Sequence, residues 1–270
     1  MKTALTIAGS DSGGGAGIQA DLKAFAAQGV YGMSVITAVT AQNTMEVRSV
    51  QDISPSIIKD QIEAVFDDIP VDAVKIGMLS SSEIITIVAS SLEKYKPRFI
   101  VLDPVMVSKG GHHLLHEEAT EALKEKMVPL ADIITPNIPE AQSLTGLEIE
   151  NADDQMKACQ TLLTLGAKSV LLKGGHLSGQ PNDLFYDGEQ FYWLKGERIH
   201  TKNTHGTGCT LSSAIAANLA KGASLLEAVQ ISKEYITTAI RHSLELGRGH
   251  GPTHHFYDLY KKANLVSNHS

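Results

Sequence analysis

The sequence predicts an α/β fold: a mostly parallel central sheet, helices on both faces, and a small antiparallel patch late in the chain. Three observations support this prediction. Short runs rich in β-branched residues alternate with longer segments of helical period along most of the 270 residues, which is typical of βαβ units. The strand candidates are almost continuously apolar, as expected when both faces of a sheet are covered. No internal repeat, low-complexity tract or linker interrupts the pattern, so we expect one domain over residues 1–270.

The parallel part of the sheet is expected to hold the β-branched segments that stand between helical ones. They are Leu5–Ala8, Ser34–Val39, Ala73–Ile76, Phe99–Leu102, Ile133–Thr135 and Ser169–Leu172. Helical periodicity predicts helices at about Ala16–Gln28, Pro55–Phe66, Ser82–Lys94, Glu117–Lys126 and Asp153–Leu165. A helix that connects two parallel strands makes a right-handed crossover, so the alternation predicts helices on both sides of the sheet.

The pattern changes near Asn182, where a hairpin is expected. Asp187-Gly188 is a strong turn signal between two further strands, Leu184–Tyr186 and Gln190–Leu194. A third segment, Arg198–Thr201, is expected to extend this antiparallel patch. Two helices follow, at about Thr210–Ala220 and Leu225–Leu244. The second helix has an apolar stripe on one face and charges between, so we interpret it as a structural helix that packs on the core.

Composition describes an ordinary globular protein and narrows the function classes. The 23 Lys and Arg residues against 30 Asp and Glu residues leave a net charge of −7, so no broad basic surface is expected for a nucleic acid. Two cysteines, Cys159 and Cys209, are too few for a disulfide framework and fit a reducing compartment. The apolar runs fall short of the ~18 residues that a membrane-spanning helix needs, and the N-terminus lacks a signal-peptide pattern. We therefore expect a soluble, cytoplasmic protein that binds neither nucleic acid nor membrane.

A glycine-rich loop, Gly9–Gly17, lies between the first expected strand and the first expected helix. Glycines let the backbone approach a ligand closely, and a helix start presents free N–H groups. The loop lacks the Gly-Lys-Ser/Thr of a P-loop, and Ile18 stands where the dinucleotide fingerprint needs its last glycine. It is therefore a binding loop of another kind or a flexible turn. Asp21, one turn into the helix, is a favourable charge near the helix N-terminus or a carboxylate directed into a pocket.

The segment Asn203–Thr210 is the most informative one, because it enters an apolar, alanine-rich helix. Successive N–H groups around Gly206–Cys209 would converge with the helix dipole on one place. They would hold concentrated negative charge there, such as that of a phosphoryl group in transfer. Cys209 would sit at the helix start, where the pKa of a thiol typically falls below its free value of ~8.5. The alternative is a small buried residue in a helix cap, and Cys159, inside an expected helix, is interpreted as core.

Motifs along the whole chain connect these two loops to a known family. They are Ala8-Gly9-Ser10-Asp11 with Gly13–Asp21, Ala41-Gln42-Asn43-Thr44, Lys75-Ile76-Gly77-Met78-Leu79, Leu102-Asp103-Pro104-Val105-Met106, Thr135-Pro136-Asn137-Ile138-Pro139-Glu140, Lys173-Gly174-Gly175-His176, Asn203–Cys209 and Gly251-Pro252-Thr253-His254-His255. With them the chain resembles the ribokinase-like small-molecule kinases. It is most similar to the bacterial hydroxymethylpyrimidine/phosphomethylpyrimidine kinases of thiamine biosynthesis. The resemblance implies the ribokinase-like three-layer α/β/α sandwich.

The resemblance also implies an ATP- and Mg²⁺-dependent phosphotransferase that forms a homodimer. Such an enzyme phosphorylates 4-amino-5-hydroxymethyl-2-methylpyrimidine and then its monophosphate. Most ribokinase-like enzymes have an aspartate base where this chain has Cys209. The pyrimidine kinases share the cysteine with a branch of the pyridoxal kinases, so a pyridoxal or pyridoxine kinase is the alternative. A metabolite-binding regulator without turnover is a third interpretation, which the intact Asn137/Glu140 pair and the Gly206–Cys209 loop disfavour.

The family's G-x-G-x loop supplies the expected catalytic residues. They are Gly206, Thr207, Gly208 and Cys209, and Thr207 also counts among the ATP contacts. Phosphoryl transfer is mostly positioning and charge neutralisation, which the amides of this loop would supply. Cys209 is a base for the alcohol or a group that only positions the reactants.

Four further residues are expected to bind ATP and the metal. Asn137 and Glu140 match the family's N-x-x-E motif for Mg²⁺ and phosphates, and their one-turn spacing puts both on one helix face. Their alternative is a helix start with a capping-box pair. Asp103 would reach the metal through water, or it is a turn-forming aspartate before proline. Lys173 would offset phosphate charge, or it lies at the exposed end of a strand.

Gln42 is the candidate for substrate choice, because a 2-methyl-4-aminopyrimidine offers an amino donor beside a ring-nitrogen acceptor. A glutamine carboxamide pairs with both, as it does with adenine; the alternative is a polar residue at a strand end. Met78 and Val105 would supply apolar walls for the ring, and Gly9 and Asp21 complete the expected substrate contacts.

The eleven histidines have no zinc-site spacing, and we interpret them as loop and surface residues. His205 is the exception, because it stands inside the second glycine loop. The stretch after Lys109-Gly110-Gly111 is a candidate lid over the site.

Overall fold

The computed structural model describes residues 1–106, 119–175 and 180–265. The candidate lid after Lys109-Gly110-Gly111 and the first residues of the expected helix Glu117–Lys126 lie outside the described residues. Within them, we find no helix with the length and apolar character that crossing a membrane requires.

A nine-stranded sheet runs through the described residues in the order β3-β2-β1-β4-β5-β6-β7-β8-β9. Its strands are β1 Thr3–Asp11, β2 Tyr31–Gln42, β3 Val47–Asp52, β4 Ala73–Ile76, β5 Ile100–Leu102, β6 Ile133–Ile134, β7 Val170–Leu172, β8 Asp183–Tyr186 and β9 Phe191–Leu194. The strands from β2 to β7 in this order pair in parallel, whereas β3, β8 and β9 pair antiparallel. The predicted mostly parallel sheet with a late hairpin is confirmed.

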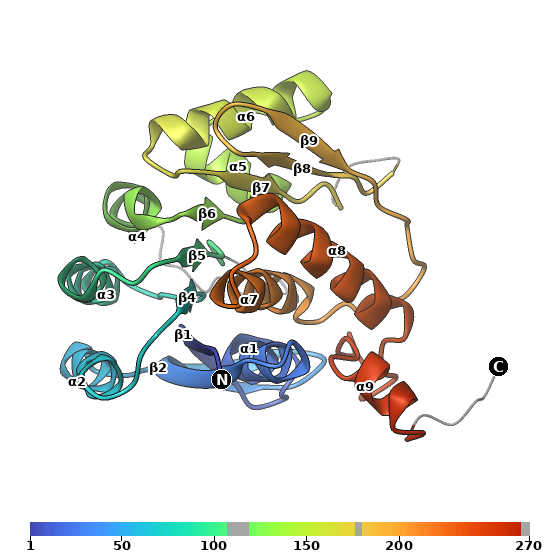
Figure 1. The fold of residues 1–270 in the computed structure, drawn as a ribbon, viewed down its shortest axis with the longest axis horizontal. Coiled ribbons are helices and arrows are strands. Elements are labelled where there is room, and N and C mark those ends of the chain that lie inside the picture. Colours follow the sequence, from blue (N-terminus) through green and yellow to red (C-terminus); the bar gives the residue numbers. More distant parts are fainter. Residues whose placement is uncertain (107–118, 176–179, 266–270) are drawn as a thin grey trace.

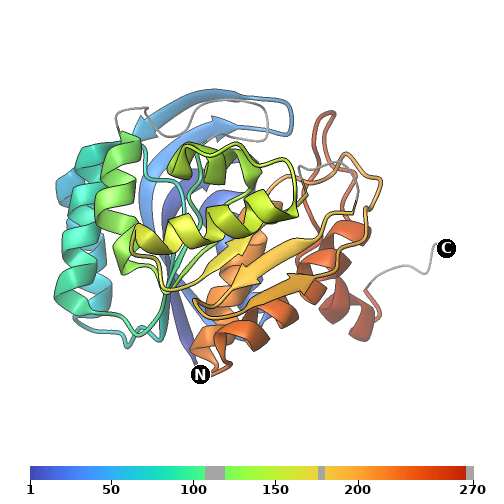
Figure 2. The ribbon, with the colours of Figure 1, turned by 90° about the horizontal axis from the view of Figure 1, so that it is seen from above.

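Helices cover both faces of this sheet and complete three layers (Figures 1 and 2). They are α1 Gly17–Ala27, α2 Pro55–Phe66, α3 Ser82–Tyr95, α4 Ala119–Ala122, α5 Ile138–Thr145, α6 Ala152–Thr164, α7 Thr207–Ala220, α8 Leu225–Arg241 and α9 Tyr257–Lys262. Figure 1 shows α2, α3 and α4 on one side of the sheet and α1, α7 and α8 on the other. Beyond α4, a π-helical turn, Leu123–Met127, continues the chain.

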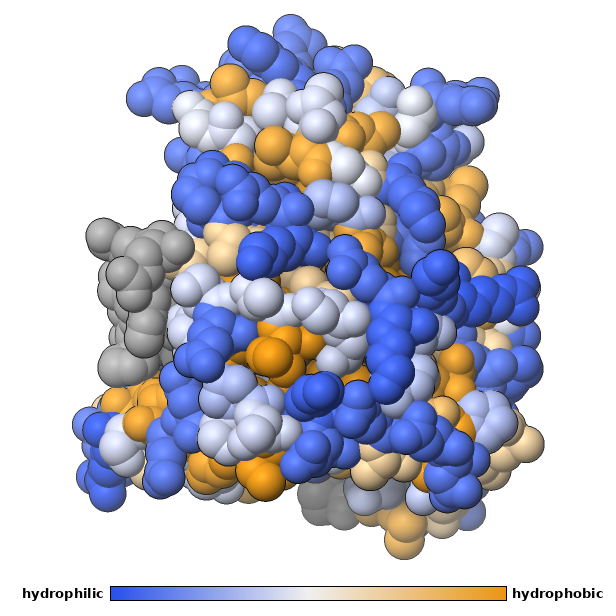
Figure 3. Space-filling view, turned by 90° about the vertical axis from the view of Figure 1, so that its left-hand side faces the viewer, coloured by the Kyte–Doolittle hydropathy of each residue, from blue (hydrophilic) through white to orange (hydrophobic). Residues whose placement is uncertain are grey.

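Two hydrophobic cores fill the space between the layers, because successive residues of a strand point to opposite faces. In β1, Leu5 and Ile7 join the core that includes Ile62 of α2. Ala4 directly precedes Leu5 and faces the other core, which includes Phe25 of α1 and residues of α7. Figure 3 views the α2–α3 side from outside, where hydrophilic groups surround smaller hydrophobic areas. These helices are therefore amphipathic, as their sequence period predicts.

Helix α7 is buried along almost its whole length, from Thr210 to Ala220. Its small residues allow close packing against α1, α8 and the strands β1 and β4. The polar side chains inside it are satisfied; Asn218, for example, donates to the backbone oxygen of Ala214 at 2.8 Å. Because it is covered on every side, its first turn has a fixed place relative to the ends of the strands.

Some elements differ from the prediction. The segment Arg198–Thr201 is not a strand; its residues up to Ile199 line the cavity described below and do not pair with β9. The sequence does not predict β3, a largely exposed edge strand that pairs with β2 on one side. It also does not predict α9, which has no buried residue. Helix α5 was expected only as a helix start after Pro136, and it runs for two turns.

Replacing Phe25 by alanine should destabilise the protein by about 3–5 kcal/mol, because this fully buried ring fills the core between α1 and the sheet. Equilibrium unfolding in urea measures the change. Ile57→Ala is the control, since Ile57 on α2 is 50% exposed, and it should change the free energy of unfolding by less than ~0.5 kcal/mol. Equal losses in the two variants would contradict this assignment of the core.

Candidate active site

A cavity of about 980 Å³ lies at the edge of the sheet where the parallel strands end. In open α/β sheets, ligands bind at the carboxyl ends of the strands. Here, residues at the ends of β1, β2, β4, β5, β6 and β7 meet the first turn of α7 and one face of α8. All the residues predicted for the site except Asp21 line this cavity: Gly9, Gln42, Met78, Asp103, Val105, Asn137, Glu140, Lys173, Gly206, Thr207, Gly208 and Cys209.

The start of α7 packs against the first glycine loop. Gly206, just before the first helical turn, has a φ of 75°, a conformation that glycine adopts without strain. A Cβ at Gly206 would also stand 1.7 Å from the backbone oxygen of Gly15, so this contact leaves no room for a side chain. The Thr207 hydroxyl donates to the backbone oxygen of Thr204 at 2.8 Å and stabilises the turn. The packing places the positive end of the α7 dipole at the cavity wall.

Lys173, Asp103 and Glu140 gather beside this first turn. Lys173 Nζ lies 3.1 Å from Asp103 Oδ1, and a Cβ at Gly208 would lie 3.3 Å from the same nitrogen. Asn137 and Glu140 form a capping box at the start of α5, so the structural interpretation of this pair is confirmed, and both residues also line the cavity. Burial raises the pKa of Glu140 to about 7, although the charge of Lys173 acts in the opposite direction.

The two carboxylates of this group fit a magnesium ion that also binds phosphates. Mg²⁺ usually keeps several waters and is held by one or two carboxylates together with the phosphates of a substrate. Asp103 and Glu140 supply such oxygens beside the ammonium group of Lys173. In the part of the chain that the structure describes, no group of three or more His, Cys, Asp or Glu could hold a metal ion by itself. The donor set therefore suits a nucleotide-bound ion.

The prediction of a lowered pKa for Cys209 is wrong. The thiol is half-buried, and desolvation raises its pKa to about 11, although the charge of Lys75 opposes this effect. The negative charges of Asp21 and Asp103 add to the increase, because they disfavour a thiolate. At neutral pH the free protein therefore holds Cys209 as a thiol. Cys159 is fully buried, as its interpretation as core requires.

Asp21 lies beneath the cavity wall and is fully buried. Its carboxylate forms an ion pair with the equally buried Lys75, whose Nζ stands 2.9 Å from each carboxylate oxygen. The hydroxyls of Thr6 and Ser213 also donate to Asp21, at 2.6 and 2.7 Å. The expected contact of Asp21 with substrate is therefore wrong, because these groups occupy the carboxylate. Asp21 instead holds Lys75, which is among the cavity-lining residues. Burial acts to lower the pKa of Lys75, but Asp21, Cys209 and Asp103 together raise it, so Lys75 stays charged.

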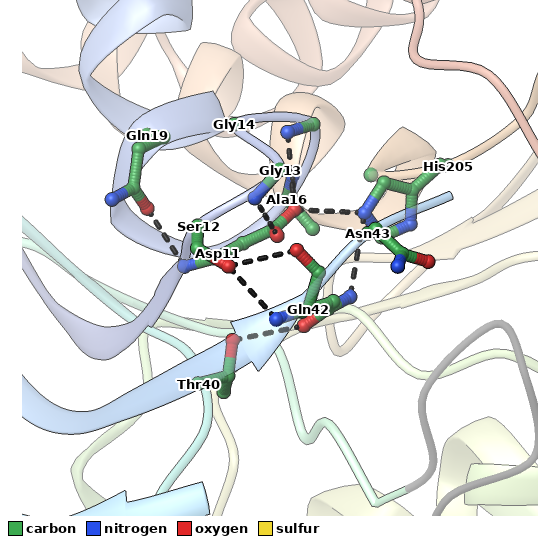
Figure 4. Close-up of polar contacts among 12 residues, drawn as sticks. Asp11, Ser12, Gly13, Gly14, Ala16, Gln19, Thr40, Gln42, Asn43 and His205 are labelled. Carbon is green, nitrogen blue, oxygen red and sulfur yellow. Dashed lines mark hydrogen bonds and ion pairs between the residues drawn. The ribbon is translucent and has the colours of Figure 1, made fainter. Parts of the chain in front are cut away.

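Asp11 joins the first glycine loop to the second one (Figure 4). Its carboxylate accepts three backbone N–H groups and lies 2.8 Å from His205 Nε2. The three amides are those of Gly13, Gly15 and Ala16. Burial acts to raise the pKa of Asp11, but His205 and the amides outweigh burial and hold this pKa below its usual range. Asp11 is therefore a buried carboxylate ion that fixes the place of His205.

Gln42, Met78 and Val105 lie on the wall of the same cavity as His205. Met78 packs against Gly9, where a Cβ would stand 3.0 Å from the Met78 sulfur. The half-buried Gln42 offers a carboxamide, and the other two side chains offer apolar surface. This combination suits a flat ring with one polar edge.

The sequence reasoning missed several residues of the cavity. In the sequence, Lys75 and Asp11 stand out only as parts of longer motifs. A lysine inside the otherwise apolar strand Ala73–Ile76 could by itself have indicated a buried charge with a specific partner. The cavity also extends to one side of α8, with Lys233, Ile236, Thr237 and Ile240 on its wall. No local signal marks these positions, because they follow the ordinary amphipathic period of a packed helix.

The raised pKa of Glu140 predicts how the stability of the ligand-free protein changes with pH. An acid that binds its proton more tightly in the folded state loses stability as pH rises from its unfolded to its folded pKa. For Glu140 this range runs from 4.5 to about 7. Glu140→Gln retains a capping acceptor and removes the titration, so its stability in urea unfolding should fall less across this range than that of the wild type.

Glu227→Gln is the matched control for this measurement. Glu227 occupies the same capping-box position in α8, and its hydrogen bonds to Ser224 lower its pKa instead of raising it. This variant should keep the wild-type fall in stability. If Glu140→Gln also keeps the wild-type fall in stability, a group other than Glu140 causes that fall.

Comparison with known proteins identifies the family. The sequence model described as phosphomethylpyrimidine kinase matches residues 11–254 of this chain. The hydroxymethylpyrimidine/phosphomethylpyrimidine kinase of Rhizobium meliloti is 53% identical over 262 residues, which are 96% of this chain and 98% of that protein. The thiamine biosynthesis bifunctional protein ThiED of Geobacter sulfurreducens is 54% identical over 93% of this chain, and the chain spans 51% of that longer protein.

Solved structures of similar proteins have the same fold. A phosphomethylpyrimidine kinase from Clostridium difficile aligns with a TM-score of 0.81 and 55% identity, over 89% of this chain and 100% of that one. A pyridoxal kinase from Bacillus subtilis, in an ADP complex, aligns with a TM-score of 0.88 and 44% identity, over 94% and 97% of the two chains. This chain therefore belongs to the phosphomethylpyrimidine kinase family and is a phosphotransferase with the ribokinase-like fold.

Proposed function

We propose that this kinase phosphorylates the hydroxymethyl group of 4-amino-5-hydroxymethyl-2-methylpyrimidine and then the resulting monophosphate, in thiamine biosynthesis and with ATP as donor. The observation that carries the proposal is the presence of Gln42 and the first turn of α7 on one cavity wall. The carboxamide has an adjacent donor and acceptor, which match the amino group and ring nitrogen of this pyrimidine. The start of α7 attracts the negative charge of a phosphoryl group.

At the phosphate end, the chain's own residues supply positioning and charge neutralisation. The amides of Gly206–Cys209 hold the group in transfer, and Lys173 and Asn137 contact the phosphates of ATP. Asp103, through water, and Glu140 hold Mg²⁺, which neutralises phosphate charge when it is bound. These roles are supported by the fact that all these residues line the same cavity.

At the ring end, Met78 and Val105 pack on the two faces of the pyrimidine, and Gly9 leaves room for it. The thiolate of Cys209, a minor form at neutral pH because the pKa of the thiol is raised to about 11, accepts the proton of the alcohol in the first phosphorylation. Lys75 lies close enough to Cys209 to favour its thiolate electrostatically. The second phosphorylation needs no such base, because a phosphomonoester with a second pKa of ~6 is already mostly dianionic at neutral pH.

We further infer that residues 1–270 act as one domain in the cytoplasm, and as a homodimer. The single sheet through the described residues supports the first inference, and the two free cysteines fit a reducing compartment. The family resemblance supports the homodimer. Light scattering on the purified protein measures its mass in solution, and a monomer at all concentrations would contradict the last inference.

A pyridoxal kinase is the second candidate, because the Bacillus subtilis pyridoxal kinase aligns over almost the whole chain. Incubation of the pure protein with MgATP and, separately, with the hydroxymethylpyrimidine, its monophosphate and pyridoxal decides between the two. We expect mass spectrometry to detect the pyrimidine monophosphate and diphosphate. Phosphorylation of pyridoxal alone would replace the proposal by the second candidate, and binding of ATP and pyrimidine without any product would contradict both.

Cys209→Ala should slow phosphorylation of the alcohol far more than that of the monophosphate, because only the alcohol loses a proton. Since the pKa of Cys209 is raised to about 11, the thiolate fraction in the wild type grows with pH. The alcohol step should therefore accelerate roughly tenfold per pH unit from about pH 7 to 9. Steady-state rates with each substrate across this range measure both effects. Equal losses in the two steps, or a flat profile, would make Cys209 a group that only positions the reactants.

A further inference from the structure

Two sets of contacts hold Gln42 (Figure 4). The loop after β1 contacts its backbone, and Thr40 and His205 contact its side chain. Ser12 Oγ donates to the backbone oxygen of Gln42 at 2.7 Å and accepts from its N–H at 2.8 Å. In the carboxamide, the nitrogen lies 3.4 Å from His205 Nε2 and the oxygen 3.2 Å from Thr40 Oγ1. A carboxamide turned by 180° fills the same space with its oxygen and nitrogen exchanged. The hydrogen-bond partners therefore decide which position the oxygen takes and which the nitrogen takes.

Asp11 determines which ring nitrogen of His205 carries a proton. The ionised carboxylate of Asp11 accepts hydrogen bonds and donates none, and only 2% of this residue is exposed. His205 Nε2 stands 2.8 Å from Asp11 Oδ2, so Nε2 carries a proton and donates it. A protonated Nε2 cannot accept a hydrogen bond from the Gln42 amide nitrogen. The Nε2–H proton points mainly to Asp11, yet its positive end repels an amide N–H and attracts an oxygen, so the carboxamide oxygen is favoured beside His205.

Thr40 leads to the same orientation independently. Its hydroxyl donates its single proton to the backbone oxygen of Ser10 at 2.9 Å, and a backbone oxygen can only accept. The Thr40 oxygen then offers only lone pairs to Gln42. The carboxamide atom beside Thr40 must therefore be the nitrogen, and both neighbours favour the turned carboxamide.

We propose that Asp11 and His205 are positioning residues, which fix the Gln42 carboxamide with its oxygen at His205 and its nitrogen at Thr40 and thereby select the ring. In this orientation one lone pair and one N–H stay free at adjacent positions of the carboxamide. They pair with an amino group beside a ring nitrogen. A ring with a carbonyl oxygen beside a ring N–H would place acceptor against acceptor and donor against donor. This inference rests on the proposed function, in which Gln42 contacts the pyrimidine.

The ring cannot avoid the mismatch by turning over, because its hydroxymethyl group has to face the start of α7 for phosphorylation. Without the Nε2–H of His205, only Thr40 favours this orientation, so the carboxamide turns more easily and accepts the opposite ring more often. Part of the discrimination between the two rings therefore depends on His205, and on the Asp11 charge that keeps the proton on Nε2.

The test compares kcat/KM for 4-amino-5-hydroxymethyl-2-methylpyrimidine and for its 4-oxo analogue, 5-hydroxymethyl-2-methylpyrimidin-4-one. We expect His205→Leu to lower the preference for the amino ring by about tenfold or more, mainly through KM, because unpaired polar groups cause such discrimination. His205→Gln retains an N–H donor near the position of Nε2 and should recover most of the preference. Asp11→Asn, which removes the charge and keeps the shape, should lower the preference as well.

His255→Leu is the matched control, because His255 is also a buried histidine that contacts α7. Its Nε2 lies 2.9 Å from Thr210 Oγ1, and it has no hydrogen bond with Gln42 among those that the described residues make. We expect this variant to lose thermal stability and to keep the ring preference of the wild type. If His205→Leu lowers kcat/KM equally for both rings, His205 is structural only and the inference is overturned.

A second measurement reads the orientation without turnover. In ligand-free protein labelled with ¹⁵N-glutamine, the Gln42 side-chain signal is the one that disappears in Gln42→Leu. Its amide protons should show nuclear Overhauser effects to the Thr40 methyl group and none to the His205 ring protons. The reverse pattern overturns the inference even if the pyrimidine is a substrate. Should no pyrimidine be phosphorylated, the proposed function fails, and this spectrum still decides the orientation.

Discussion

The contact between the start of α7 and the loop after β1 is the interaction on which the rest of the site depends. Gly206 lies against the backbone of Gly15, and His205 bonds to Asp11 across 194 positions of the sequence. About two turns further along α7, Ser213 bonds to Asp21 across 192 positions. Both α7 and β1 are buried in the middle of the molecule, so densely packed side chains surround these contacts. They fix where the start of α7 stands relative to the end of β1 on the cavity wall.

The charges around this contact explain how a chain with a net charge of −7 attracts a phosphate. Lys173 and the positive end of α7 line one region of the cavity, and the fully buried ammonium group of Lys75 adds its positive charge near Cys209. Each lysine has a carboxylate partner, Asp21 or Asp103, that keeps it charged in spite of burial. The same carboxylates, with desolvation, keep the thiol of Cys209 protonated. The carboxylates that keep Lys75 and Lys173 charged therefore also disfavour the thiolate form of Cys209.

Features with a local signal could be predicted from the sequence. The apolar runs that became β1 and β4, and the turn at Asp187-Gly188, depend only on neighbouring residues. The family motifs, each a short segment, contain most of the residues on the cavity wall but none of those from α8. The edge strand β3 could not be predicted, since its mostly exposed residues lack the apolar pattern of a buried strand and its pairing with β2 forms only in the fold. The direction of the Cys209 pKa also could not be predicted, because it depends on Lys75, Asp21 and Asp103, which come from three other segments.

The sequence by itself determined the order of most strands and helices, the two glycine loops and the kinds of side chains that line the cavity. Only the tertiary structure decided which of these side chains meet a ligand. Asp21 and Lys75 both look available in the sequence, yet folding buries both side chains completely and pairs them with each other. The reason is physical: local patterns set backbone conformation, whereas burial, charge partners and hydrogen-bond direction arise from segments that meet only after the chain has folded.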